Sequence, residues 1–318
     1  MPTLNKSARF PRLNTLRFVP ANDVLTTGYN TFPFDRAFFR QQIKTYFQQD
    51  TDYAQKVEYS DEITIYLDCL ANTIDIYAID VYGNIVATIA SAHSYTHSAT
   101  GNVDSYYGNQ YYTFIKQFFP VDHGLSNGFY HIVVKAIYAT DTDPLTNTLF
   151  VSECIQTTSR IGGWEKTILF EYSNTINDYN VFWGASGTPN PWAFRVEAYL
   201  DIDPASNVVA FEDMTFEVEK LQDTPYRVAE LMVGPQGVPP WVLDKVSRIL
   251  ALDTFTIDGV RWKKDAGANL AIKKAENFPM KYGSIKLRNT DATTEEEYNN
   301  AGPDTFRYHD DSHDDFHD

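Results

Sequence analysis

Three histidines and five aspartates gather in the stretch HDDSHDDFHD (309–318), the part of the sequence whose residue types best suit metal chemistry. His309, His313 and His317 are spaced four apart, so a helix would place all three on one face. Imidazole and carboxylate groups are ligands for zinc and other divalent ions. However, the aspartates repel one another and Gly302-Pro303 interrupts a helix arriving from upstream. We therefore expect a solvated or subunit-docking segment, sensitive to salt and to pH near 6–7, with no resident metal or cofactor.

Other candidates for chemistry are weaker. His93 and His97 share one face of a strand or a helix, but a catalytic zinc site needs three protein ligands and an open position. The stretch DIDPASN (201–207) opens like a calcium loop but lacks its glycine, so it is either a cation site or a strand-to-turn aspartate pair. The carboxylates of Asp61-Glu62 could serve a glycosidase. A chain with 42 acidic residues contains such pairs by chance.

Sequence motifs for the common catalytic folds are absent. There is no GxxxxGK[ST] phosphate loop, no GxGxxG after a strand, no HExxH and no GxSxG. We therefore expect a protein that is not an enzyme.

Aromatic loops offer a binding surface instead. Trp183 and Trp192 flank the polar stretch GASGTPNP, within a long loop. Such residues can stack on sugars, form a protein interface or cover a core, and the sequence leaves all three open. Tyrosines occupy a similar loop at positions 106, 107, 111 and 112.

The elements that would position these groups are mostly strands. In DEITIYLDCL, Ile63, Ile65 and Leu67 alternate with polar or aromatic residues, and similar stretches recur up to residue 158. This spacing predicts an antiparallel β-sandwich domain over 58–158. The further strand-like stretches are TIDIYAIDV, IVATIA, YYTFIKQFF, FYHIVVKAIY and TLFVSECIQT.

A second β domain is predicted over 159–235, from the stretches KTILFEYS, AFRVEAYLD, MTFEVEKL and PYRVAELMV. Next comes a helix–hairpin module over 236–290 that packs on the second domain. Two prolines precede WVLDKVSRILAL, a position where proline favours the start of a helix. TFTI-DG-VRWK then predicts a two-residue type I′ hairpin. The fold class is thus mainly β, with tandem sandwich-like domains.

The first 57 residues are predicted to be an N-terminal arm and connecting segment. Cations alternate with apolar residues, and Pro2, Pro11 and Pro20 disfavour helix. Such an arm could lie across a neighbouring subunit or be a disordered terminus. A helix is expected over 34–49. The residues chosen as candidates for partner binding are Arg9, Arg12, Arg17, Trp183, Trp192 and Trp241.

The charge distribution restricts the partners. The net charge of −16 argues against nonspecific nucleic-acid binding. Residues 291–318 hold ten acidic residues and one base, a net −9, whereas residues 256–290 hold eight bases and three acids, a net +5. These blocks either dock, within or between subunits, or are solvated independently.

The remaining sequence features predict a soluble protein that is made inside the cell. Cys69 and Cys154 lie far apart without a CxxC motif, so two free buried thiols are expected. There is no apolar run long enough to span a membrane and no signal-peptide core.

Two stretches resemble virion proteins of phages that infect Bacteroidetes. The first covers residues 53–89, and the matching positions are Gln55, Lys56, Asp61, Ile63, Ile65, Asp80, Gly83 and Val86. The second, residues 233–267, is similar to the C-terminal element of the same family: a Gly-Pro loop, an amphipathic helix and an Asp-Gly hairpin with a basic exit.

The resemblance is to tail components of crAss-like or related podophages. It implies a structural ring, hub or adaptor protein between portal and tail tip, assembled as a cyclic homo-oligomer in contact with other tail proteins. It also implies a virion location, after synthesis in the host cytoplasm. The alternative from the residues is a glycan-binding tail or surface protein that uses the aromatic loops.

Overall fold

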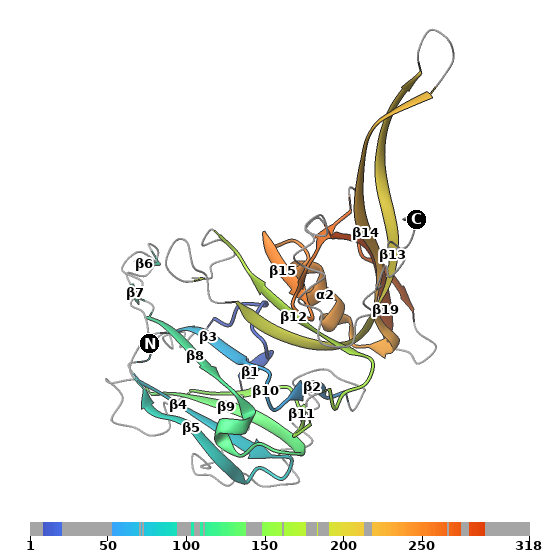
Figure 1. Cartoon of the computed structure of the whole chain (residues 1–318). Helices are drawn as coiled ribbons and strands as arrows, with labels where there is room; N and C mark the ends of the chain where they lie inside the picture. The colour runs from blue at the N-terminus through green and yellow to red at the C-terminus, as the bar shows by residue number, and fades with distance from the viewer. Residues whose placement is uncertain are drawn as a thin grey trace, which may run out of the picture.

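The computed structural model describes residues 9–20, 53–69, 71, 73–93, 103–104, 109–110, 112–137, 148–160, 162–175, 183, 191–212, 218–265, 267–274 and 280–289. Strands dominate these residues, which confirms the mainly β prediction (Figure 1). No helix within them is long and apolar enough to cross a membrane. The predicted helix over 34–49 and the stretch 309–318 lie outside the described residues.

The first half of the chain forms a seven-stranded sheet with a two-stranded sheet beside it. Most pairs are antiparallel, but β11 and β2 run parallel. The strands of the larger sheet are β1 (Phe18–Pro20), β2 (Gln55–Glu58), β4 (Thr73–Asp80), β5 (Ile85–His93), β9 (Gly128–Ile137), β10 (Thr148–Ser152) and β11 (Ile155–Thr158). The smaller sheet consists of β3 (Ile63–Cys69) and β8 (Tyr112–Phe118). The described part of this half also contains a short 3₁₀ helix, η2 (Pro120–His123), and a minor pair, β6 (Val103–Asp104) with β7 (Asn109–Gln110).

Strand β3 lies between two hydrophobic cores. Ile63, Ile65 and Leu67 pack into a core with the seven-stranded sheet. Tyr66, on the opposite face, packs into a second core that belongs to the later strands. Both faces of β3 are therefore buried, although the alternating sequence is typical of a strand with one polar face.

The second half forms an eight-stranded sheet with one helix, α2 (Pro240–Ile249), against it. Its strands are β12 (Thr167–Ser173), β13 (Trp192–Glu212), β14 (Val218–Val238), β15 (Thr254–Ile257), β16 (Val260–Arg261), β17 (Lys263–Lys264), β18 (Ala271–Lys274) and β19 (Lys281–Asn289). Helix α2 begins with Pro240 after Pro239, as predicted. In the predicted hairpin, Asp258 and Gly259 have φ angles of 50° and 79°, as a type I′ turn requires.

Strands β13 and β14 form a hairpin of two 21-residue strands. The sequence predicted separate shorter strands here, with an aspartate pair or a cation loop at 201–207. Instead, pairing continues to Glu212↔Val218, with one irregularity after Val209. Pro204 and Pro225 do not interrupt this pairing, because a two-stranded ribbon has open edges where proline is tolerated.

The N-terminal segment 9–18 is not a free arm, and that prediction is wrong for these residues. Leu13 packs into the second core, whereas Leu16 and Phe18 pack into the first. The side chain of Asn14 mimics a strand partner: its Nδ2 donates to Tyr66 O (2.8 Å), and its Oδ1 accepts from Tyr66 N (2.9 Å). The alternating apolar residues are thus used inside the protein's own fold.

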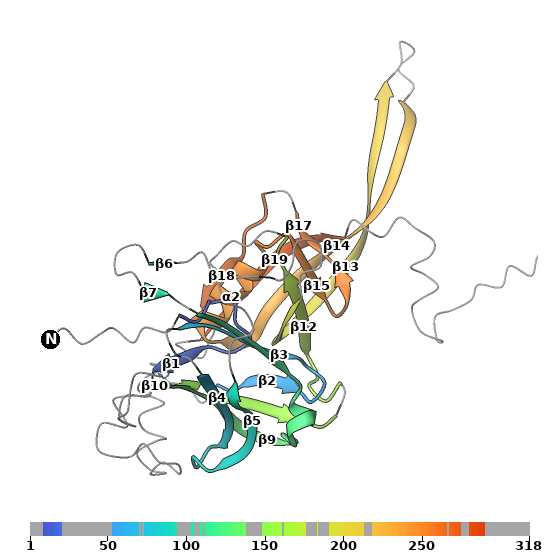
Figure 2. The same ribbon diagram turned by 90° about the vertical axis from the view of Figure 1, so that its left-hand side faces the viewer.

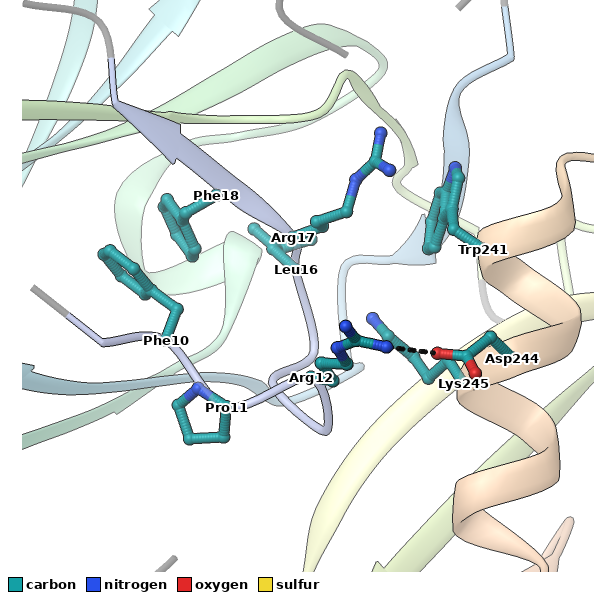
Figure 3. Close-up of a pocket in the computed structure, with 9 residues that line it drawn as sticks. All are labelled: Phe10, Pro11, Arg12, Leu16, Arg17, Phe18, Trp241, Asp244 and Lys245. Atoms are coloured by element: carbon teal, nitrogen blue, oxygen red, sulfur yellow. Dashed lines mark ion pairs between the residues drawn. The ribbon is translucent and has the colours of Figure 1, made fainter. Parts of the chain in front are cut away.

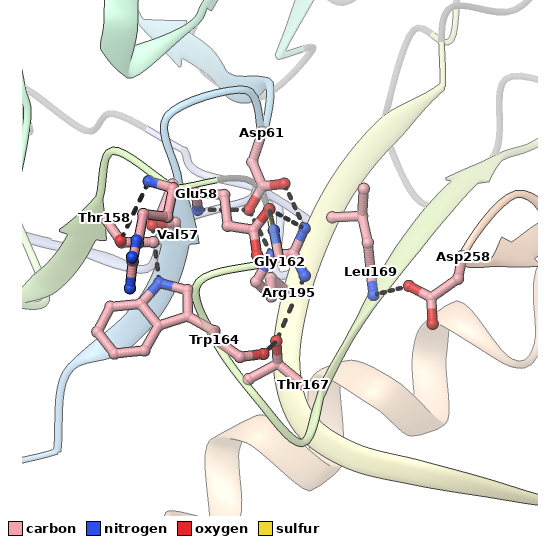
Figure 4. A network of polar contacts seen from close by, with 11 residues as sticks. Val57, Glu58, Asp61, Thr158, Gly162, Trp164, Thr167, Leu169, Arg195 and Asp258 are labelled. Atoms are coloured by element: carbon pink, nitrogen blue, oxygen red, sulfur yellow. Dashed lines mark hydrogen bonds and ion pairs between the residues drawn. The ribbon is translucent and has the colours of Figure 1, made fainter.

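A buried ion cluster also connects the two halves (Figure 4). Arg195, on β13, donates from Nε and Nη2 to the two carboxylate oxygens of Asp61, at 2.7 and 2.8 Å. Glu58 lies 3.4 Å from the same guanidinium group and accepts a hydrogen bond from Gly162 N. The three side chains are 11%, 6% and 3% exposed, respectively. Asp61, considered above as one of a catalytic pair, therefore has a structural partner.

Candidate functional site

The cleft between segment 9–18 and helix α2 brings together three of the six predicted partner-binding residues. Arg12, Arg17 and Trp241 line a cavity of about 380 Å³ (Figure 3). The other lining residues are Phe10, Pro11, Leu16, Phe18, Asp244 and Lys245. We call this surface the α2 cleft.

The two arginines extend from segment 9–18 toward α2. Arg12 forms an ion pair with Asp244 at 3.7 Å, but its side chain is 74% exposed, so this pair contributes little to stability. Arg17 is more constrained. Its backbone N–H donates to Glu153 (2.9 Å), and its guanidinium lies 5.0 Å from the centre of the Trp241 ring. Arg12 is thus the cation that a partner could recruit most easily.

Behind the cleft lies a buried pair of opposite charge, Lys245 and Glu153, which are 3% and 1% exposed. The Lys245 ammonium donates to Thr15 O (2.9 Å) and lies 4.4 Å from the centre of the Phe194 ring. Burial lowers the pKa of Lys245 to about 8, although the charge of Glu153 opposes this change. Burial likewise raises the pKa of Glu153, against the attraction of Lys245 and Arg17.

This arrangement offers charged and aromatic groups for binding. The Lys245 amine is almost fully buried and already donates a hydrogen bond to Thr15 O. Among the described residues, no group of three or more His, Cys, Asp or Glu side chains could hold a metal ion. Guanidinium groups beside an indole ring match a carboxylate or an aromatic side chain of a protein partner.

The remaining predicted site residues lie elsewhere. Trp183 and Trp192 are each 2% exposed and belong to the second core, with ring centres 4.6 Å apart. They cover the core, which was one of the three roles left open. Arg9 is exposed and forms a β-bridge with Asp68. The loop tyrosines 106, 107 and 111 lie outside the described residues.

Sequence analysis missed Glu153 and Lys245 as parts of this region. Glu153 lies between β10 and β11 in an apolar stretch, and Lys245 lies on the inward face of α2. A charged residue at an apolar position of a helix is the signal that could have identified Lys245.

Cys69 and Cys154 are free, as predicted, although Cys154 is only half-buried.

Comparisons with family models, with curated proteins and with solved structures give no match for this chain. The site is therefore interpreted from its own geometry.

Proposed function

We propose that the protein is a structural subunit of a bacteriophage tail, part of a ring, hub or adaptor assembly between portal and tail tip. It is built from tandem sandwich-like units, forms a cyclic homo-oligomer and contacts other tail proteins. The tail assignment rests on the resemblance of residues 53–89 and 233–267 to virion proteins. The proposal that the chain assembles rests on a separate observation, the β13–β14 hairpin.

This hairpin extends away from the rest of the protein (Figures 1 and 2). Strand β14 pairs with β19 through Arg227, and beyond that point residues 205–212 and 218–226 pair only with each other in the described chain. Nine residues of strand correspond to about 30 Å of ribbon. An isolated two-stranded ribbon is marginally stable in water. Contact with a neighbouring subunit would supply the stabilisation that an isolated ribbon lacks.

The experiment is to shorten the hairpin and measure assembly. Replacing residues 204–227 with Asn-Gly joins Asp203 to Val228, which are paired across the hairpin, through a type I′ turn. We expect the wild-type chain to form particles of uniform size by light scattering and electron microscopy, and the shortened chain to remain a folded monomer. Circular dichroism establishes that it is folded.

The matched control removes exposed apolar side chains from the other sheet. Tyr82 and Val86 are each 48% exposed, and the variant Tyr82→Ser/Val86→Ser should assemble normally. Particles of unchanged size from the shortened chain would contradict the role of the hairpin. Sugar binding through Trp183 and Trp192 is not proposed, because both side chains are buried.

A further inference from the structure

One edge of the eight-stranded sheet carries a concentration of exposed cations. Strands β17 and β18 both pair with β19 (Figure 2). We call this surface the basic edge. Its exposed cations are Lys263, Lys264, Lys273, Lys274 and Lys286.

The pairing register places like charges opposite each other on the basic edge. Lys263 pairs with Arg288, and Lys274 pairs with Lys281. Like charges at directly opposed positions destabilise a sheet. Glu230 lies opposite Lys286 and offsets part of this charge. An anionic segment laid along the edge would relieve the remaining repulsion.

The chain itself supplies such a segment. Strand β19 ends at Asn289, beside β17, and residues 291–318 follow with their net charge of −9. At roughly 3.3 Å per extended residue, ten of these residues could reach about 30 Å, the length of β19. Because the segment is tethered, its effective concentration at the edge is on the order of millimolar, which favours the same chain over a neighbour.

We propose that the acidic segment 291–318 docks on the basic edge of its own subunit. Docking neutralises cations that would otherwise attract other anions, and it covers short strands at an open sheet edge. The sequence left three possibilities open: docking within a subunit, docking between subunits and independent solvation. The pairing register and the position of the end of β19 favour docking within a subunit. This inference is independent of the assembly role, which rests on the β13–β14 hairpin.

The test uses the full-length chain with a fluorophore attached after Asp318. A docked segment restricts the fluorophore, so its anisotropy should be high in 20 mM salt and fall as salt is raised toward 0.5 M, where the Debye length is only about 4 Å. In Lys263→Glu/Lys264→Glu/Lys286→Glu, the anisotropy should already be at the high-salt value in low salt. An excess of a peptide with the sequence 291–318 should lower the wild-type value by competition.

The control reverses three cations outside the basic edge, as Lys116→Glu/Arg160→Glu/Lys166→Glu, and should retain the wild-type anisotropy. Equal anisotropy in the edge variant, the control and the wild type would overturn the proposal. The anisotropy should not change on tenfold dilution. A fall on dilution would show that the segment binds a neighbouring copy instead, which also overturns docking within the subunit.

Discussion

Replacing Arg195 with methionine should severely destabilise the protein, because it removes the only cation from the buried cluster that joins the two halves. The substitution keeps an unbranched apolar stem but leaves Asp61 and Glu58 without their guanidinium partner. Burial lowers the pKa of Arg195, but the hydrogen bonds and charge of Asp61, with the charge of Glu58, outweigh burial and raise it. The arginine therefore remains charged in the fold, and its removal leaves two acids facing each other.

The expected magnitude follows from the burial of the cluster. An exposed ion pair would contribute about 0–1 kcal/mol. Here Arg195 is 11% exposed and Asp61 is 6% exposed, and two short hydrogen bonds join them. Breaking a buried pair of this kind costs about 3–5 kcal/mol, since the remaining charge stays buried without compensation. We therefore expect Arg195→Met to lower the free energy of unfolding by about 4 kcal/mol.

The assay is equilibrium unfolding in urea, followed by tryptophan fluorescence, for Arg195→Met, Asp61→Asn and the double variant. Because the double variant removes both members of the pair, it should be more stable than the sum of the single losses predicts. The coupling free energy should be about 2 kcal/mol or more. A loss below about 1 kcal/mol for Arg195→Met would refute the reasoning, because it would place the cluster among solvent-screened pairs.

Two further predictions concern pH. Burial lowers the pKa of His131 to about 4, so His131 takes up its proton at a higher pH in the unfolded chain than in the folded one. The free energy of unfolding should therefore fall by up to about 3 kcal/mol as pH falls from 6.5 toward 4. Acid titration of His131→Asn should lack this loss. Burial also lowers the pKa of Lys245 to about 8, so stability should rise between pH 8 and 10.5 as the unfolded chain loses the proton that the folded chain has already released. Urea unfolding of Lys245→Met should lack that rise; an unchanged slope in either variant would assign the effect to other groups.

The local elements were predictable because their signals are local. Period-two alternation located β3, β4, β8 and β9, and the two prolines and the Asp-Gly pair located α2 and the β15–β16 turn. In each of these, the residues that define the element lie within a few positions of one another. Propensity and turn chemistry therefore decide the outcome before tertiary packing acts.

The predictions that failed depended on which distant surfaces meet. Segment 9–18 has the alternation of an arm, and nothing within it shows that Leu13 and Leu16 will enter two different cores. Trp183 and Trp192 flank a polar stretch of the sequence, yet both pack into the second core against Tyr172. Burial of this kind is set by tertiary context, which neither loop composition nor periodicity encodes.

The candidate site was predictable only in part, because the sequence shows residue types but not which distant residues meet. Arg12, Arg17 and Trp241 were selected from their residue types, and the structure brings them into one cleft. They were expected to contact a neighbouring subunit, whereas the α2 cleft lies between two parts of one chain. The buried pair Lys245 and Glu153 behind it joins residues 92 positions apart (245 − 153), a pairing that only the fold supplies.

The most direct test of the assembly proposal is the mass of the purified full-length chain, measured by mass photometry from nanomolar to micromolar concentration. A cyclic homo-oligomer predicts one dominant species at a fixed multiple of 36.3 kDa, with closed rings in electron micrographs of the same sample. A single species at 36.3 kDa throughout that range would contradict self-assembly through the projecting hairpin.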